Sequence, residues 1–265
     1  MAHAARKTAE RIVPYWTGKF SVLVTAHRGF SGDAPENTLA AFRKAIDTGS
    51  DMMELDVRFS KDAQMVVIHD DTLDRTTNGR GKVSDYTLKE LKQLDAGSWF
   101  APQISSEQIP TLKEVLELAK GKIPVNIEIK DDSRGQYKIT DLADRALQEV
   151  KKAGMAEGVI FSSFYPSSLQ RIKERDPRMW VALLYHRDWQ SLGEVTGGRA
   201  FSVVNLRHSF LTREKIRRIH QEGMKVNTYT VNSEEEMEKF IGWGIDGIIT
   251  NHPDKLIQIL KKKSP

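Results

Sequence analysis

Two carboxylates and a histidine occupy a stretch that otherwise reads as buried β-structure. Residues 51–71 read DMMELDVRFSKDAQMVVIHDD, and Glu54 and Asp56 alternate there with apolar residues. Because side chains alternate along a strand, the two carboxylates share one face and their apolar neighbours share the other. The return run 65–68 then ends on His69. These residue types predict a site that holds a cation and moves a proton.

The stretch PVNIEIK, residues 124–130, shows the same alternation, with Asn126, Glu128 and Lys130 on one face. An unpaired buried charge costs several kcal/mol, so such residues need partners or a metal. The chain has no cysteine, which excludes disulfides, thiolate metal sites and a cysteine nucleophile. We therefore expect one divalent ion, Ca²⁺ or Mg²⁺ rather than zinc, on three carboxylates. The expected ligands are Glu54, Asp56 and Glu128.

A third stretch, VLVTAHRG, ends on His27, Arg28 and Gly29, where the glycine lets the backbone turn sharply. His27 adds a second imidazole to pair with His69. Arg28 and Lys130 supply positive charge fitted to a phosphate, Arg by its bidentate fork and Lys as a point charge. Two imidazoles, one divalent ion and two cations suit phosphodiester cleavage, because they provide a base, an acid and stabilisers of an anionic transition state.

The elements that must position these residues are short β-branched runs that alternate with helical patterns. Two of the nine runs, 52–57 and 65–68, are too close for a crossover helix and predict an antiparallel hairpin. The remaining eight predict an α/β fold, a TIM-like (β/α)8 barrel, whose active site gathers at the carboxyl ends of the strands. The expected strands are 21–26, 52–57, 65–68, 124–129, 158–162, 180–185, 201–206, 225–231 and 246–250.

The register of the hairpin decides which polar residues meet. A two-residue turn at residues 62–63 would place Asp56 opposite His69 and Glu54 opposite Asp71. In the alternative, residues 51–71 and 124–130 form solvent-facing antiparallel strands whose polar residues have no chemical role. The βα pattern of the rest of the chain favours the barrel.

Composition limits the partners and the compartment. The 265 residues carry a net charge of +4, from 40 basic and 36 acidic residues mixed along the chain. We expect no nucleic-acid partner, because that needs a concentrated basic face. The longest apolar runs are far shorter than the ~20 residues that span a bilayer. Oligomeric state stays open.

We expect one barrel domain over residues 21–260, with an inserted subdomain at about 72–123. A basic extension over residues 1–20 precedes it and has no continuous apolar core, so we read no signal peptide. A cytoplasmic location is favoured, although the sequence does not exclude export. The extension is either a packing arm or a short basic helix that makes weak contact with a membrane surface.

With these residues identified, the sequence resembles the glycerophosphodiester phosphodiesterase family over residues 22–255. The resemblance implies a barrel of the phospholipase C-like phosphodiesterase type, with a small subdomain inserted after the return strand. It rests on ordered motifs: AHRG (26–29), PENTLAAF (35–42), ELDV (54–57), VVIHDDTLDRTTNGRG (66–81), IPTLKEVL (109–116), NIEIK (126–130) and YTVN (229–232).

The resemblance implies roles for individual residues. His27 and His69 match the family's catalytic pair, as proton acceptor and proton donor. The metal ligands fall on Glu54, Asp56 and Glu128, the phosphate contacts on Arg28 and Lys130, and rim positions on Glu36, Asn37 and Tyr229. Glu36 and Asn37 have helix capping as an equal alternative. The family often has Trp in place of Tyr229 and Asp in place of Asn251.

The implied reaction converts a small-molecule glycerophosphodiester, such as glycerophosphocholine or glycerophosphoethanolamine, into sn-glycerol 3-phosphate and an alcohol. The nucleophile is water or the substrate's own glycerol hydroxyl. The enzymatic alternative is a lysophospholipase D-like or phosphoinositide-lipase-like activity, which wants an apolar, membrane-facing mouth. A non-catalytic binding protein on the same barrel is a further alternative. Such a protein would have no physical need for three carboxylates and two imidazoles inside a barrel, so catalysis is favoured.

Overall fold

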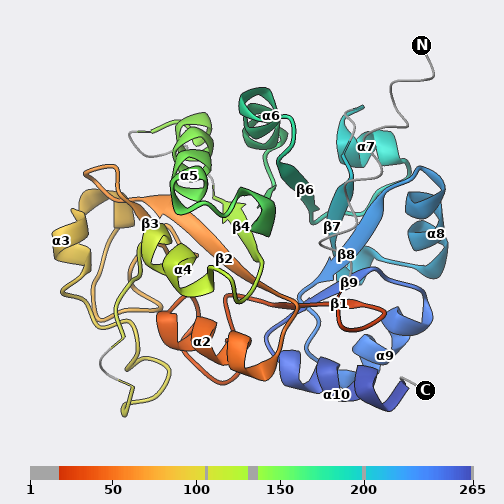
Figure 1. Ribbon diagram of the computed structural model, residues 1–265, viewed down its shortest axis with the longest axis horizontal. Helices are drawn as coiled ribbons and strands as arrows, with labels where there is room; N and C mark the ends of the chain where they lie inside the picture. The colour runs from red at the N-terminus through yellow and green to blue at the C-terminus, as the bar shows by residue number, and fades with distance from the viewer. Residues whose placement is uncertain (1–17, 105–106, 131–136, 199–200, 264–265) are drawn as a thin grey trace.

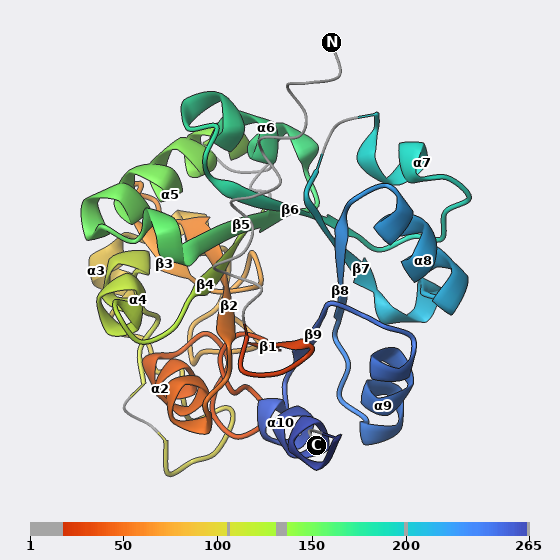
Figure 2. The same cartoon turned by 45° about the vertical axis from the view of Figure 1, so that its right-hand side comes forward.

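Eight parallel strands close into a barrel in the computed structural model, which describes residues 18–104, 107–130, 137–198 and 201–263 (Figure 1). The first strand, β1, pairs with β9 on one side and β2 on the other, which closes the ring and confirms the expected TIM-like fold (Figure 2). The barrel strands are β1 (Leu23–Ala26), β2 (Met52–Phe59), β4 (Val125–Ile129), β5 (Val159–Ser163), β6 (Trp180–Tyr185), β7 (Val203–Arg207), β8 (Lys225–Tyr229) and β9 (Gly247–Thr250).

Helices cover the outside of the barrel, as the alternating pattern predicted. Met53, Leu55 and Ile127, on the outward faces of β2 and β4, are fully buried in one apolar core with Leu112 and Leu116 of helix α4. Burial of these side chains stabilises each strand against its helix. The helices are α2 (Leu39–Thr48), α4 (Leu112–Ala119), α5 (Ile139–Ala153), α6 (Pro166–Arg175), α7 (Leu192–Thr196), α8 (Arg213–Gln221), α9 (Glu234–Gly242) and α10 (Pro253–Lys263).

The expected hairpin is present, but its register differs from the prediction. Strand β3 (Met65–Val67) runs antiparallel to the end of β2, and the Ile68 amide donates to the Asp56 carbonyl at 3.0 Å. Asp56 therefore lies opposite Ile68, not His69, and the predicted pairing of Glu54 with Asp71 is wrong by the same single step. The physical reason is a three-residue loop, in which Ala63 adopts a left-handed conformation with φ 56°.

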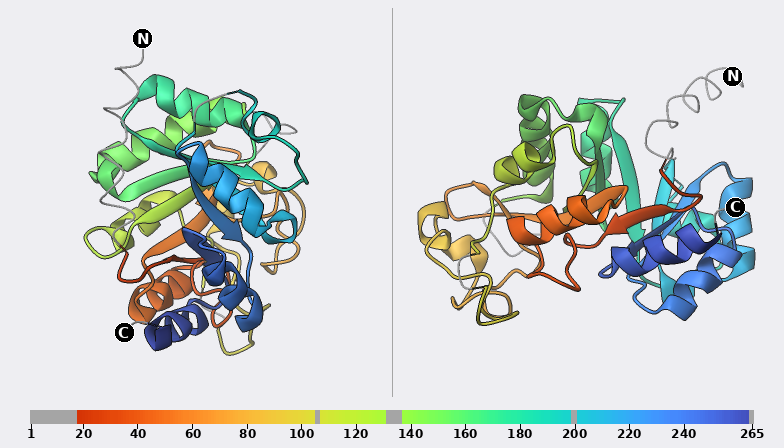
Figure 3. Two further views of the ribbon diagram at one scale, coloured as in Figure 1. Left: turned by 90° about the vertical axis from the view of Figure 1, so that its right-hand side faces the viewer. Right: turned by 60° about the horizontal axis from the view of Figure 1, so that its bottom comes forward.

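The segment between β3 and α4 forms a small subdomain at one side of the barrel (Figure 3). It contains the 3-10 turn η2 (Val83–Asp85) and the short helix α3 (Leu88–Leu91). Its own apolar cluster includes Leu73, Leu91 and Ile109 and is distinct from the barrel core. Helix α4, which follows, packs on the barrel core. The subdomain therefore has its own small hydrophobic core and lies beside the strands that carry the acidic residues.

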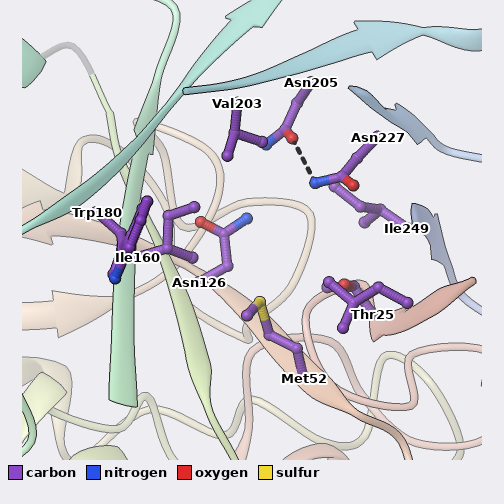
Figure 4. Close-up of a pocket in the computed structure, with 10 residues that line it drawn as sticks. Thr25, Met52, Asn126, Ile160, Trp180, Val203, Asn205, Asn227 and Ile249 are labelled. Atoms are coloured by element: carbon purple, nitrogen blue, oxygen red, sulfur yellow. Dashed lines mark hydrogen bonds between the residues drawn. The ribbon is translucent and has the colours of Figure 1, made fainter. Parts of the chain in front are cut away.

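The amino-terminal half of the barrel interior is filled. Leu23, Met52, Ile160, Ala182 and Val203 form an apolar layer there. Three buried asparagines adjoin this layer. Asn227 donates from Nδ2 to Asn205 Oδ1 at 2.9 Å, and Figure 4 shows Asn126 across the barrel from this pair. The cavity between these side chains measures only about 10 Å³. A substrate can therefore reach the polar interior only from the carboxyl ends of the strands.

In the parts of the chain that the structure describes, no helix is both long and apolar enough to cross a bilayer.

Candidate active site

Three carboxylates meet inside the barrel, as the strand alternation predicted. Glu54 and Asp56 come from β2 and Glu128 from β4, where Asp56 and Glu128 are register neighbours. One oxygen from each lies within 4.8 Å of the others. All three residues are buried, with Asp56 completely inaccessible. The alternative of solvent-facing antiparallel strands is thereby excluded for β2 and β4, which are parallel neighbours with buried inner faces.

The charges of this trio are unequal. Burial raises the pKa of Glu54 well above its usual value, and repulsion from Asp56 and Glu128 adds to the rise. Burial also raises the pKa of Glu128, although Lys130 opposes it. Asp56 differs, because Lys130 and Arg28 outweigh its burial and its pKa falls far below the ordinary value. Two repelling carboxyls beside a firmly ionised one make an environment that a divalent cation would stabilise.

One atom of the trio supports the fit to a metal. Asp56 Oδ1 is buried and accepts no hydrogen bond from the described residues, and the Lys130 ammonium lies 3.5 Å from it. A buried carboxylate oxygen normally has a hydrogen-bond donor or a cation to coordinate. An all-oxygen donor set is the kind that Ca²⁺ and Mg²⁺ prefer. The residues present therefore fit one hard divalent ion.

Two cations converge on the same carboxylate. Arg28 Nε lies 3.4 Å from Asp56 Oδ2, and Lys130 Nζ lies 3.5 Å from Asp56 Oδ1. Lys130 also donates from Nζ to Glu128 Oε1 at 2.7 Å. Burial opposes the charge of each cation, but the neighbouring carboxylates together outweigh it and raise both pKa values: Asp56, Glu36 and Glu54 at Arg28, and Asp56 and Glu128 at Lys130. Arg28 adopts φ 55°, rare for a residue with a side chain, and its amide donates to Glu54 Oε2 at 2.8 Å. Both cations are permanently charged beside the acidic trio.

His27 follows β1 and stands next to Asn251, because β1 and β9 are neighbours in the closed barrel. Its Nδ1 lies 2.7 Å from Asn251 Oδ1 and its Nε2 lies 4.0 Å from Glu54 Oε2. The amide oxygen can only accept, so Nδ1 carries the proton and Nε2 is free to take one. Burial, aided by the charge of Arg28, lowers the pKa of His27 to about 3. The imidazole is therefore neutral at physiological pH.

His69 lies just beyond β3, where Arg58 Nε donates to its carbonyl at 2.9 Å. Its Nδ1 lies 2.7 Å from Asp70 Oδ1, and the side chain is 31% exposed. Burial lowers the pKa of His69, although the charge of Asp56 opposes the shift. The second imidazole thus stands at the edge of the charged cluster and is more exposed to solvent than His27.

The three expected rim residues occupy different positions. Asn37 donates from Nδ2 to Asp56 Oδ2 at 2.9 Å and is buried beneath the rim, with φ 58°. The N-cap of α2 is Thr38, not Glu36 or Asn37, and Glu36 Oε1 accepts from Arg28 Nη1 at 2.7 Å. Tyr229 donates to the Tyr185 carbonyl at 3.0 Å. Glu36 and Asn37 thus form hydrogen bonds with charged residues of the cluster, Arg28 and Asp56, and do not cap helix α2.

An aromatic group borders the cluster. The ring of Phe164 makes edge contacts with Tyr229 and His186, at centroid distances of 6.2 and 5.1 Å. The Lys130 ammonium lies 6.0 Å from the centre of the Phe164 ring. This group provides an aromatic wall beside Lys130.

Sequence reasoning missed several contacts of the imidazoles. It recorded Asn251 only as a departure from the family, although barrel closure brings the end of 246–250 beside the end of 21–26 and so beside His27. It assigned no role to Asp70, which follows His69 directly. Arg75, whose guanidinium donates to Glu36 and Asp70, had no signal of this kind, because it lies in the irregular insertion, where no periodicity predicts orientation.

Comparison with known proteins agrees with this geometry. A family model described as "Glycerophosphoryl diester phosphodiesterase family" matches residues 27–255. A glycerophosphodiester phosphodiesterase of Caldanaerobacter subterraneus is 41% identical, over 91% of this chain and 98% of the relative. A putative glycerophosphodiester phosphodiesterase of Bacillus subtilis is 40% identical, over 89% and 96%.

Solved structures show the same likeness in space. An Oleispira antarctica phosphodiesterase, solved in complex with the product sn-glycerol-3-phosphate, superposes with a TM-score of 0.81 at 31% identity, covering 90% of this chain and 96% of that one. A putative glycerophosphoryl diester phosphodiesterase from Silicibacter pomeroyi superposes with a TM-score of 0.84 at 24% identity, covering 93% and 96%, and supports the fold alone.

The barrel and the charged cluster at the carboxyl ends of its strands define a TIM-barrel enzyme. The matched family model covers most of the chain, and the relatives agree with it. The chain belongs to the glycerophosphoryl diester phosphodiesterase family.

Proposed function

We propose that this enzyme uses one divalent metal ion to hydrolyse glycerophosphodiesters, such as glycerophosphocholine and glycerophosphoethanolamine, to sn-glycerol 3-phosphate and an alcohol. The observation that carries the proposal is a cluster of charges centred on Asp56. The permanent cations Arg28 and Lys130 both contact Asp56, which lies beside the carboxylates of Glu54 and Glu128. The neutral His27 lies 4.0 Å from Glu54. A phosphodiester monoanion fits between cations, and an imidazole beside it can act as a base.

Glu54, Asp56 and Glu128 would hold the metal. When bound, the ion would supply Lewis-acid stabilisation of a phosphoryl oxygen and of the attacking hydroxyl. Arg28 and Lys130 bind the phosphodiester and offset the negative charge that grows in the transition state. Asn37 holds Asp56 in place through the hydrogen bond to Oδ2.

The two imidazoles move the protons. His27 Nε2 takes a proton from the nucleophile, either water or the substrate's glycerol hydroxyl, as the new O–P bond forms. The bond from phosphorus to the alcohol oxygen breaks, and His69 donates a proton to that oxygen. When water is the nucleophile this step gives sn-glycerol 3-phosphate directly. When the glycerol hydroxyl attacks, the step gives a cyclic glycerol phosphate, which water then opens in a second step with the acid and base roles of the two histidines exchanged. A bound phosphodiester anion favours the protonated form of His69 against its lowered pKa. His27 is held for its role by Asn251, which fixes the proton on Nδ1.

The test measures release of glycerol 3-phosphate from glycerophosphocholine by purified enzyme and by His27→Gln and His69→Gln. Each substitution should lower kcat by about 100-fold or more, the usual scale of general acid–base catalysis. A lysophospholipid is assayed in parallel. Release from the lysophospholipid but not from any glycerophosphodiester would favour the lipid-directed alternative, and no release from either would favour a binding protein.

A further inference from the structure

Arg75, which belongs to the insertion rather than to the barrel, joins two carboxylates at the edge of the site. Its Nη1 and Nη2 donate to the two oxygens of Glu36, each at 2.8 Å. Its Nε donates to Asp70 Oδ2 at 2.6 Å, and Nη2 also reaches Asp70 Oδ1 at 3.2 Å. All three nitrogens of one guanidinium are therefore used in a planar clamp on two side chains from different parts of the chain.

Each clamped carboxylate has a second partner in the site. Glu36 Oε1 also accepts from Arg28 Nη1 at 2.7 Å, and Asp70 Oδ1 lies 2.7 Å from His69 Nδ1. Arg75 thus closes a continuous chain of charge-assisted hydrogen bonds. One end of the chain is Arg28, which faces Asp56, and the other end is the half-buried imidazole of His69.

We propose that Arg75 is a positioning residue, which fixes the spacing between the phosphate-binding Arg28 and the proton donor His69 through Glu36 and Asp70. The inference rests on the proposed function. Asp70 holds the proton of His69 on Nδ1, so that Nε2 is the nitrogen that exchanges a proton with the leaving alcohol. Arg75 holds Asp70 in the orientation that makes this bond. Because the same guanidinium also bonds Glu36, it fixes the position of Asp70 relative to Glu36.

Charge and exposure support a role in positioning rather than in folding. Burial opposes ionisation of Glu36, but hydrogen bonds and charge from Arg75 and Arg28 lower its pKa. In Asp70 the same balance, with Arg75 and His69 as partners, lowers the pKa to about 2. Both carboxylates are thus ionised acceptors. The Arg75 side chain itself is 43% exposed, so solvent screens its charge and its loss should leave folding nearly intact.

The experiment compares Arg75→Lys and Arg75→Met with the wild type on two diesters that share glycerol phosphate. In glycerophosphocholine the leaving choline needs a proton, whereas in a glycerophosphate p-nitrophenyl diester the leaving nitrophenolate does not. We expect kcat on glycerophosphocholine to fall about 10-fold to 100-fold, because lysine cannot clamp two carboxylates. On the nitrophenyl diester the loss should be at least about threefold smaller, since proton donation matters less there.

Controls separate this role from a structural one. Arg80→Lys changes an exposed arginine of the same insertion and should leave both rates unchanged. In an Asp70→Asn background, Arg75→Lys should cost much less than in the wild type, because the bridge is already broken.

Three results would overturn the role of Arg75: equal losses on both diesters, full additivity with Asp70→Asn, or an Arg75→Lys loss explained by a lowered melting temperature. No turnover of either diester by the wild type would instead overturn the proposed function itself, before any variant is compared.

Discussion

Asp56 and Glu54 lie two residues apart on β2, yet their surroundings separate their behaviour. Asp56 faces Arg28, Lys130 and the Asn37 amide, and its pKa is lowered. Glu54 faces two other carboxylates in a buried position, and its pKa is raised. Opposite pKa shifts in neighbouring acids are typical of sites arranged for chemistry. They also predict opposite effects on stability.

In the metal-free protein, Asp56→Asn should lower the free energy of unfolding by about 3 kcal/mol, because it leaves two buried cations without their shared counter-charge. Glu54→Gln should be neutral or stabilising at pH 7.5. Ionised Glu54 costs stability above its unfolded pKa, since its folded pKa is raised, and glutamine removes that cost. Urea unfolding with EDTA measures both. An equal loss in the two variants would contradict this account of the cluster.

Metal binding should depend on pH with a definite sign. Because the pKa values of Glu54 and Glu128 are raised, these two carboxyls stay protonated up to a higher pH than an ordinary carboxyl does. Protons therefore compete with the metal as pH falls. We expect Ca²⁺ or Mg²⁺ to raise the melting temperature more at pH 8 than at pH 5.5, each measured against EDTA at the same pH. The same rise at both pH values would show that these carboxyls do not bind the ion.

At the scale of elements, Gly29 lets β1 pass directly into the loop that carries Glu36 and Asn37. Its φ is 78°, and a β-carbon there would lie 2.6 Å from the Ala41 carbonyl carbon in α2. Gly121 has a similar φ of 71° but meets no atom within 4 Å. The pair separates the cost of backbone conformation from the cost of crowding.

Gly29→Ala should destabilise the protein by about 2–4 kcal/mol, as left-handed strain and overpacking combine. Gly121→Ala should cost only the backbone strain, about 1 kcal/mol. Gly29→Ala should also lower kcat, because the preceding Arg28 amide bonds Glu54. Chemical denaturation and the glycerophosphocholine assay test both effects. If the two alanine variants lost equal stability, the close approach of Gly29 to α2 would be irrelevant.

Regular elements were the part that the sequence could predict. Strand alternation placed Glu54, Asp56 and Glu128 on the inner face, because a two-residue period leaves only two choices and the apolar set must face the helices. The hairpin register failed, because the loop depends on Ala63 adopting a conformation for which glycine or asparagine is the usual signal. The Arg75 bridge was beyond reach, since two irregular segments make it: the loop that carries Glu36 and the insertion that carries Asp70 and Arg75.

At the scale of the whole molecule, the two ends of the barrel interior differ: side chains fill the amino-terminal end, and the charged cluster lies toward the carboxyl end. The apolar layer and the asparagines fill the amino-terminal half, while the cations, the carboxylates and His27 stand toward the carboxyl ends of β1, β2 and β4, and His69 follows β3. The insertion has its own small core beside them and contributes Asp70 and Arg75. This division separates the residues that hold the fold from those that we propose to bind substrate.

The measurement that tests the central claim most directly is glycerol 3-phosphate release from glycerophosphocholine, by wild type and by Glu128→Gln. Each is assayed after EDTA treatment and after addition of Ca²⁺ or Mg²⁺ over a range of concentrations. The account predicts that EDTA abolishes release, that one of the two ions restores it in the wild type, and that Glu128→Gln needs far more of that ion. Full release in EDTA, or an unchanged metal requirement in Glu128→Gln, would contradict it.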